Sequence, residues 1–207
     1  AGSGALEVAC DGYRIDAVHR GQLIEIQHGS LAAIRPKIAK LLKKHRVKVV
    51  KPIVTRKQLL KLDRRGGEIV ERRLSPKRGK LLDLFDELVY FTRVFPHKRL
   101  TLEVALVEVE ELRFPGHGRR RRRRRKDFQI EDQRLVEVGN VHRFRTLADL
   151  RKMLPGNLPD QFSTAHIAKG LQVQRWVAQR IAYCVRETGA IERVGEQGNT
   201  LLYRQAR

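Results

Sequence analysis

The segment from residue 13 to residue 54 restricts the fold most, because it holds a hairpin, a helix and a buried strand in close succession. Residues 13–27 alternate apolar and polar side chains on either side of Arg20-Gly21, which is typical of two antiparallel strands joined by a tight turn. Residues 31–46 repeat apolar side chains at helical spacing, and residues 47–54 form a nearly continuous apolar run. The predicted order is therefore strand, strand, helix, strand.

Polar side chains in this hairpin form the candidate metal site. Side chains alternate between the two faces of a strand, so we expect Glu25 and Gln27 on one face and Ile24 and Ile26, packed, on the other. Asp16, on the neighbouring strand, would lie beside Glu25 and Gln27. Two carboxylates held on rigid strands supply the hard oxygen ligands that Mg²⁺ or Mn²⁺ prefers. The alternative interpretation is an amphipathic hairpin whose outward face is acidic.

This arrangement resembles the PD-(D/E)XK nuclease superfamily, which has the restriction-endonuclease-like fold. In that family an Asp and the Glu of a Glu-x-Lys sequence ligate Mg²⁺, and the Lys positions or activates the attacking water. The resemblance implies that Asp16 and Glu25 hold the metal and that Gln27 completes the catalytic set in place of the Lys. Gln27 can orient a water by hydrogen bonds but supplies no positive charge. Ile15 stands where the motif has its proline.

The net charge of +21 indicates a polyanionic partner, and nucleic acid, above all double-stranded DNA, fits best. The two cysteines, Cys10 and Cys184, give neither a disulfide framework nor a zinc spacing, which suits a reducing cytoplasm. No apolar run is long enough to span a membrane. We therefore expect a cytoplasmic protein that has no membrane partner.

The candidate phosphate-binding side chains in the first part of the chain are basic residues between apolar ones. They lie on the predicted helix, in a compact turn after residue 74 and in an arginine run, and they are Lys37, Lys40, Lys44, Lys77, Arg78, Arg119, Arg120, Arg121 and Arg122. A charge-rich face is also explained by solvation alone. Adjacent like charges repel each other, so we expect the arginine run to be an extended tether.

The last third of the chain predicts three helices, at residues 146–154, 162–171 and 172–187, and a hairpin at residues 190–203. This order, with its Gln/Arg-rich third helix, resembles a winged helix-turn-helix, in which the third helix enters the major groove. The resemblance implies that Gln172, Gln174 and Arg175 face bases or phosphates. Such domains also serve as protein–protein docking modules, which stays the alternative.

The remaining signals complete the predicted architecture. A second hairpin at residues 58–74, a helix at residues 80–94 and a closing strand at residues 99–110 extend the first domain. The fold class is α+β or α/β: a restriction-endonuclease-like mixed sheet flanked by helices, plus a small winged-helix domain. The predicted boundaries are a nuclease-like domain at 1–113, an Arg-rich linker at 114–132 and a winged-helix domain at 133–207.

These patterns together predict a metal-dependent endonuclease that hydrolyses the phosphodiester bonds of DNA, with a separate DNA-binding module. Double-strand cleavage by a single active site would call for a homodimer. The alternative is a catalytically inactive nuclease fold that binds nucleic acid in a regulatory or ribonucleoprotein role, which the missing lysine favours.

Overall fold

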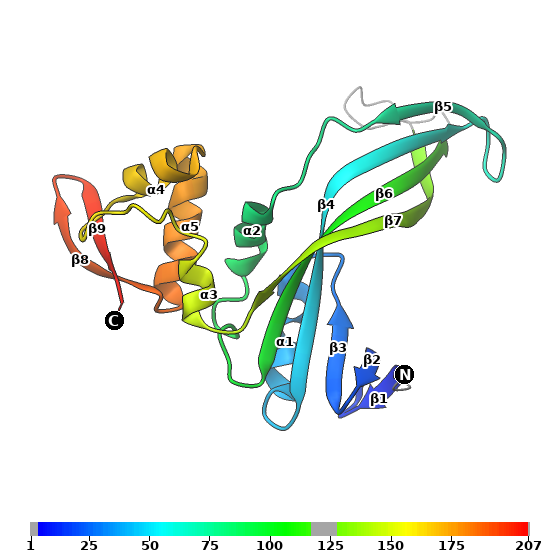
Figure 1. Ribbon diagram of the computed structural model, residues 1–207. Helices are drawn as coiled ribbons and strands as arrows, with labels where there is room; N and C mark the ends of the chain where they lie inside the picture. The colour runs from blue at the N-terminus through cyan, green and yellow to red at the C-terminus, as the bar shows by residue number, and fades with distance from the viewer. Residues whose placement is uncertain (1–3, 117–127, 207) are drawn as a thin grey trace. The chain divides into compact units, whose positions relative to one another are not determined.

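The computed structural model describes residues 4–116 and 128–206 (Figure 1). The chain divides into two compact units, and each is described by itself. The first unit is made of Ala1–Lys51, Leu82–Val104 and His142–Arg207, and the second of Pro52–Leu81 and Ala105–Val141. None of the helices in the described ranges is long and apolar enough to cross a bilayer.

The structure contains a mixed, seven-stranded sheet, which confirms the α+β class in its general form (Figure 1). Its strand order is β1-β2-β3-β4-β6-β7, and β5 pairs with β4. The pairs β1–β2, β2–β3 and β4–β5 are antiparallel, and β3–β4 is parallel. The strands are β1 Ala5–Cys10, β2 Tyr13–His19, β3 Gln22–Ile26, β4 Arg46–Leu62, β5 Ile69–Leu74, β6 Leu100–Pro115 and β7 Phe128–Phe144.

Both predicted hairpins are confirmed. The turn between β2 and β3 places Arg20 at φ 49° and Gly21 at φ 71°, the left-handed pair that a two-residue hairpin turn requires. The second hairpin pairs Gln58 with Leu74. The first strand of this hairpin is the C-terminal part of β4. The two strands predicted at 47–54 and 58–63 are therefore one strand of 17 residues.

The helix after the first hairpin, α1, runs over Leu31–Leu41, where residues 31–46 were predicted. Ser30 caps it, because its side chain accepts a hydrogen bond from the Ala32 amide. Its buried residues follow helical spacing and are Leu31, Ile34, Ile38 and Leu41. The predicted helix at 80–94 is wrong in length: a 3₁₀ turn at Leu81–Asp83 leads into α2, which covers only Leu84–Leu88.

The C-terminal part of the first unit contains three helices and a hairpin, in the predicted order. They are α3 Leu147–Arg151, α4 Thr164–Leu171, α5 Arg175–Glu187, β8 Ile191–Gln197 and β9 Thr200–Gln205. Phe162 bridges to Tyr203 of the hairpin. α5 also packs against α2, where the Cys184 thiol lies 3.6 Å from the Phe85 carbonyl and Arg180 pairs with Asp86.

The structure divides the chain differently from the predicted boundaries. β7 is continuous from Phe128 to Phe144, so it includes residues assigned to the linker and residues assigned to the winged-helix domain. Residues 142–207 also form one unit with residues 1–51 and 82–104. The arginine run, with Arg119, Arg120, Arg121 and Arg122, lies outside the described residues.

The second unit contains a small apolar cluster of Leu60, Leu62 and Leu112, with Phe114 against it. A buried carboxylate lies on the same strands. Glu111 is 3 % exposed and accepts hydrogen bonds of 2.5 Å from both the Lys57 ammonium and the Arg113 Nε. Burial alone would raise the pKa of Glu111, but the hydrogen bonds and charges of these two cations outweigh it and lower that pKa.

Candidate functional site

Asp16, a predicted metal ligand, is exposed on β2 and supports the backbone of β3. Its Oδ2 accepts a hydrogen bond of 2.7 Å from the Ile26 amide. The β2–β3 ladder ends at the pair Ala17–Ile24, so the carboxylate satisfies an amide beyond the last paired residues. One oxygen of Asp16 therefore has a structural partner.

Glu25 faces the protein interior, and the predicted arrangement of faces on β3 is wrong. Glu25 and Leu23 are 7 % and 6 % exposed, whereas Ile26 is 55 % exposed. The reason is that α1 covers the face that carries Glu25: Lys37 on α1 donates a hydrogen bond of 2.6 Å to the Glu25 Oε2. The same ammonium donates to the Arg14 carbonyl. Lys37 is thus an internal partner of the carboxylate instead of a free phosphate ligand.

Gln27 helps to close the loop that leads from β3 into α1. Its Nε2 donates a hydrogen bond of 2.9 Å to the Ser30 carbonyl. Lys51, which is 6 % exposed, donates to the carbonyls of His28 and Gly29 at 3.0 and 2.5 Å. Sequence reasoning missed Lys51, although a lysine inside an apolar strand is a signal of an internal partner, because a buried ammonium must be paired.

The ligand types at Asp16 and Glu25 still fit a hard divalent cation. Each carboxylate has one oxygen engaged, and no hydrogen bond to its other oxygen is found among the described residues. Mg²⁺ would be held by those oxygens, in competition with the Lys37 ammonium for Glu25. Among the described residues, the grouping of three metal-ligating side chains lies elsewhere, at Cys10, Asp11 and His45.

The first unit also contains a strongly basic cavity of about 370 Å³. It lies where the β2–β3 turn, the starts of β4 and β6 and the end of β7 come together. The residues that line this basic cavity are His19, Arg20, Gln22, Arg46, Lys48, Lys98, Arg99, Thr101, Arg143 and Arg145. Seven of them are Lys or Arg and none is acidic, so the cavity fits an anion.

One buried carboxylate organises part of this cavity. Glu103 is 8 % exposed and lies 2.9 Å from the Arg143 guanidinium and 3.3 Å from the Lys48 ammonium. Arg99 donates to the carbonyls of Leu42 and Lys43. For the other four cations, no ion pair is found in the described part of the chain; these are Arg20, Arg46, Lys98 and Arg145.

Sequence reasoning missed the basic cavity, although the chain carries a signal for it. Four of the seven histidines are followed directly by a basic residue, in the dipeptides His19-Arg20, His45-Arg46, His97-Lys98 and His142-Arg143. Each dipeptide lies at or beside the end of a strand, and each of the four basic members lines the cavity. The repeated dipeptide therefore marks strand ends that meet in space.

The predicted phosphate-binding residues that the structure describes lie outside this cavity. The Lys40 ammonium lies 5.1 Å from the centre of the Tyr13 ring, and Lys44 is exposed. Lys77 and Arg78 are exposed in the second unit. Whether these four side chains bind phosphate stays a prediction.

The residues predicted to read DNA lie at the start of α5. Gln172 and Gln174 are exposed on the short connection from α4, and Arg175 donates a hydrogen bond of 2.9 Å to the Thr164 hydroxyl. Trp176 is 55 % exposed, and the Arg180 guanidinium lies 5.0 Å from its ring centre. The beginning of α5 thus presents amide, cationic and aromatic groups together.

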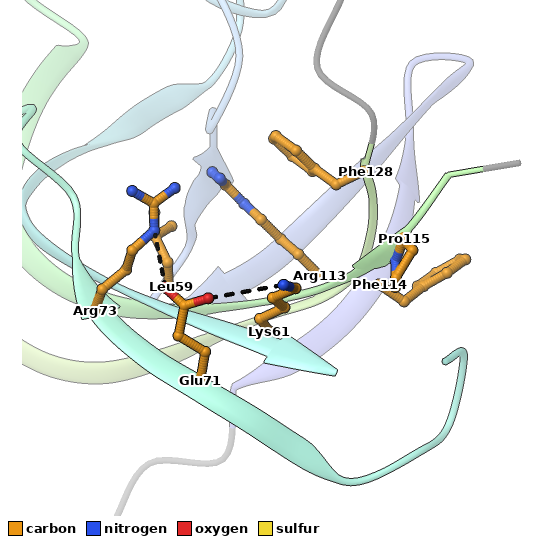
Figure 2. Close-up of a pocket in the computed structure, with 8 residues that line it drawn as sticks. All are labelled: Leu59, Lys61, Glu71, Arg73, Arg113, Phe114, Pro115 and Phe128. Atoms are coloured by element: carbon orange, nitrogen blue, oxygen red, sulfur yellow. Dashed lines mark ion pairs between the residues drawn. The ribbon is translucent and has the colours of Figure 1, made fainter. Parts of the chain in front are cut away.

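The second unit has a pocket of about 380 Å³ with a mostly apolar lining (Figure 2). Its residues are Leu59, Lys61, Glu71, Arg73, Arg113, Phe114, Pro115 and Phe128. Glu71 points between Lys61 and Arg73, with ion pairs of 3.8 and 3.9 Å (Figure 2). The Arg113 guanidinium stacks 4.0 Å from the centre of the Phe128 ring. Aromatic and cationic groups on one surface are suited to stacking against a planar ring.

Comparison with known proteins places the chain in a family. Residues 1–145 match the model of a family described as "Domain of unknown function (DUF8091)". The chain belongs to the DUF8091 family. The matched region ends one residue after β7 and just before Thr146, which caps α3.

A relative from Treponema pallidum (strain Nichols), described as an uncharacterized protein, is 30% identical to this DUF8091 chain over 201 residues. The similarity covers 96% of the chain and 78% of the relative, so it extends beyond the family match into α3–α5 and the last hairpin. No solved structure matches.

Proposed function

We propose that this DUF8091 protein binds the phosphodiester backbone of nucleic acid, double-stranded DNA above all, in the basic cavity of its first unit. The observation that carries the proposal is the excess of cations there: seven Lys or Arg side chains line about 370 Å³. Such an excess is costly for a folded protein in the absence of a counter-ion, because like charges repel. Phosphate oxygens relieve that repulsion and release condensed counter-ions from the nucleic acid.

The roles of the cavity residues follow from their contacts. Glu103 holds Arg143 and Lys48, and backbone carbonyls hold Arg99, so these three side chains have partners within the protein. Arg20, Arg46, Lys98 and Arg145 keep their donors for an incoming ligand. Arginine offers two parallel donors to a phosphate, whereas lysine acts as a point charge. The net charge of +21 adds long-range attraction to the same partner.

The test is binding of a fluorescein-labelled DNA duplex at several salt concentrations, followed by anisotropy. The cavity variant is Arg46→Gln/Lys98→Gln, and the matched control is Arg65→Gln/Arg72→Gln, which removes two exposed charges from the second unit. The slope of log affinity against log salt is negative, and each lost phosphate contact reduces its magnitude by about 0.9. The magnitude measured for the cavity variant should therefore be smaller by about 1.8. The control should keep the slope of the native protein.

Equal slopes for the native protein and the cavity variant would refute the proposal. Binding weakened to the same extent by the control would assign affinity to net charge alone. Single-stranded DNA and duplex RNA, measured in parallel, distinguish the kinds of nucleic acid, and tighter binding of either would overturn the assignment to duplex DNA.

A second candidate function, metal-dependent cleavage of DNA, is favoured by one specific arrangement. Asp16 and Glu25 lie on adjacent antiparallel strands, and Lys37 brings a cation to within 2.6 Å of Glu25. Lys37 thus places beside the carboxylates the positive charge that Gln27 lacks. In this function Asp16 and Glu25 would hold Mg²⁺, Gln27 would orient a water, and Mg²⁺ would polarise a phosphoryl oxygen.

Cleavage is tested with supercoiled plasmid and Mg²⁺ or Mn²⁺. Nicking that Asp16→Asn and Glu25→Gln abolish, with DNA binding intact, would support this candidate, and Asp160→Asn serves as a control for an exposed carboxylate elsewhere. Binding without metal-dependent nicking would leave a protein that only binds nucleic acid. Nicking that survives both substitutions would refute the assignment to these two residues.

A further inference from the structure

A cluster of three metal-ligating side chains shares no residue with either candidate site. Cys10 is the last residue of β1, Asp11 begins the turn into β2, and His45 directly precedes β4. The turn is fixed by the pairing of Cys10 with Tyr13 and by the left-handed conformations of Asp11 (φ 48°) and Gly12 (φ 79°). Two segments far apart in the sequence therefore bring a thiol, a carboxylate and an imidazole together.

The three ligand atoms converge on one point. The Cys10 Sγ lies 3.6 Å and the Asp11 Oδ2 lies 3.1 Å from the same atom, Nε2 of His45. A nucleophile–histidine–carboxylate relay uses the two different ring nitrogens, one for each partner. Here a single nitrogen faces both neighbours, and its one hydrogen cannot satisfy both. Convergence of S, N and O atoms matches the arrangement of ligands around a shared ion.

The distances agree with tetrahedral zinc. With bonds of about 2.3 Å to sulfur, 2.05 Å to nitrogen and 2.0 Å to oxygen, tetrahedral angles separate S from N by about 3.6 Å and N from O by about 3.3 Å. The cluster has 3.6 Å and 3.1 Å for these two separations, and its ligand atoms all lie within 4.8 Å of one another.

The chemistry of the three groups selects the metal. Thiolate and imidazole favour zinc and related transition metals, whereas Mg²⁺ takes oxygen ligands almost alone. The side chains of His45 and Asp11 are 32% and 33% exposed, so an ion can reach them and a water can fill a fourth position. Cys10 shows no zinc spacing in the sequence, because one of its partner ligands, Asp11, is the adjacent residue and the other, His45, lies in a distant loop.

We propose that Cys10, Asp11 and His45 bind one Zn²⁺, with a water as the fourth ligand, and that the ion holds the β1–β2 turn against the loop that precedes β4. The site shares no residue with the basic cavity or with the pair Asp16 and Glu25. Its effect is to join the outermost hairpin of the sheet to the α1–β4 connection.

The test uses untagged, reduced protein that has been stripped with a chelator and then titrated with Co²⁺. Cobalt reports the ligand set, because a bound thiolate gives a charge-transfer band in the near ultraviolet and tetrahedral geometry gives intense visible bands. One equivalent should bind, and Zn²⁺ should displace it. Cys10→Ala should remove the charge-transfer band. His45→Gln should weaken binding more than about 100-fold, because even indirect partners of a metal contribute 10–100-fold.

Matched controls separate this site from other ligands. His28→Gln removes an exposed histidine of the same unit, and Cys184→Ala removes the second, buried thiol. Both controls should bind Co²⁺ like the native protein. Circular dichroism of each metal-free variant establishes that it is folded.

A thermal melt gives an independent measurement. Zn²⁺ should raise the melting temperature of the native protein and leave that of His45→Gln unchanged, because a ligand of the folded state alone stabilises it. Absence of a stoichiometric cobalt spectrum, or equal affinity in native protein and His45→Gln, would overturn the proposal. His45 and Asp11 would then act as an ion pair that fixes the turn without metal.

Discussion

The buried carboxylate Glu111 gives the sharpest stability prediction for the second unit. The change is Glu111→Gln, which keeps the size of the side chain and removes its charge. Glu111 accepts a hydrogen bond of 2.5 Å from Lys57 and another from Arg113, whose side chains are 25% and 16% exposed. The substitution therefore leaves two largely buried cations close together without their shared counter-ion.

The expected loss follows from these contacts. Hydrogen bonds to charged groups contribute about 1.5–3 kcal/mol each, and removal of one partner of a buried ion pair costs about 3–5 kcal/mol. The amide oxygen of Gln can still accept from one cation, and both cations are partly solvated. We therefore expect the free energy of unfolding of this unit to fall by about 3 kcal/mol.

Glu108→Gln is the matched control on the same strand. Glu108 pairs with Arg56 at 3.6 Å, and their side chains are 34% and 52% exposed. An exposed pair of this kind contributes less than about 1 kcal/mol. A difference of about 2 kcal/mol or more between the two variants therefore isolates the effect of burial.

The assay must report on the second unit. The single tryptophan, Trp176, belongs to the first unit, so its fluorescence is not a suitable probe. Hydrogen exchange at increasing urea concentration, read from peptides within residues 52–62 of β4 and 105–115 of β6, measures the stability of this unit. Equal losses below about 1 kcal/mol for Glu111→Gln and Glu108→Gln would refute the reasoning, since the buried carboxylate would then contribute no more than an exposed one.

We also expect the effect of Glu111→Gln on stability to depend on pH. Because the pKa of Glu111 in the folded protein lies below its ordinary value of 4.5, the stabilisation is complete above that value. It is lost as the pH falls through the lower folded pKa. The stability difference between native protein and Glu111→Gln should thus be constant at neutral pH and shrink below about pH 4.5.

Three further predictions concern the first unit. Thr146→Ala should lower its stability by about 1 kcal/mol in urea denaturation, because the capping box between Thr146 and Asp149 is lost; an unchanged midpoint would contradict this. A chromogenic thiol reagent should label Cys10 alone in the native protein and both thiols in urea, since burial raises the pKa of Cys184 to about 12; rapid native labelling of both would contradict it. Acrylamide should quench the fluorescence of Trp176 efficiently in the free protein and less when DNA is bound, if the start of α5 contacts DNA.

The parts of the fold that local signals determine could be predicted from the sequence. The turn at Arg20-Gly21 requires two left-handed residues, and Ser30, Thr146 and Ser163 each cap the helix that follows them. Such features depend on a few neighbouring residues. The order of strands and helices in both hairpins and in the C-terminal region follows from them.

Features that depend on distant partners could not be predicted from the same signals. β3 carries apolar residues on both faces, so the burial of Glu25 is decided by α1 and its Lys37 rather than by alternation along the strand. The basic cavity is assembled from four strand ends, and no single segment reveals it. The zinc ligands likewise combine adjacent residues with His45, 34 positions away from Asp11.

The path of the chain has a consequence for its synthesis. The chain passes between the two units four times, after residues 51, 81, 104 and 141, so neither unit is a continuous stretch of sequence. On the ribosome, all of the second unit has been translated by residue 141, whereas residues 142–207 of the first unit, with α3–α5, are still to come. The second unit is therefore complete on the ribosome before the first, although residues 1–51 of the first unit precede it in the sequence.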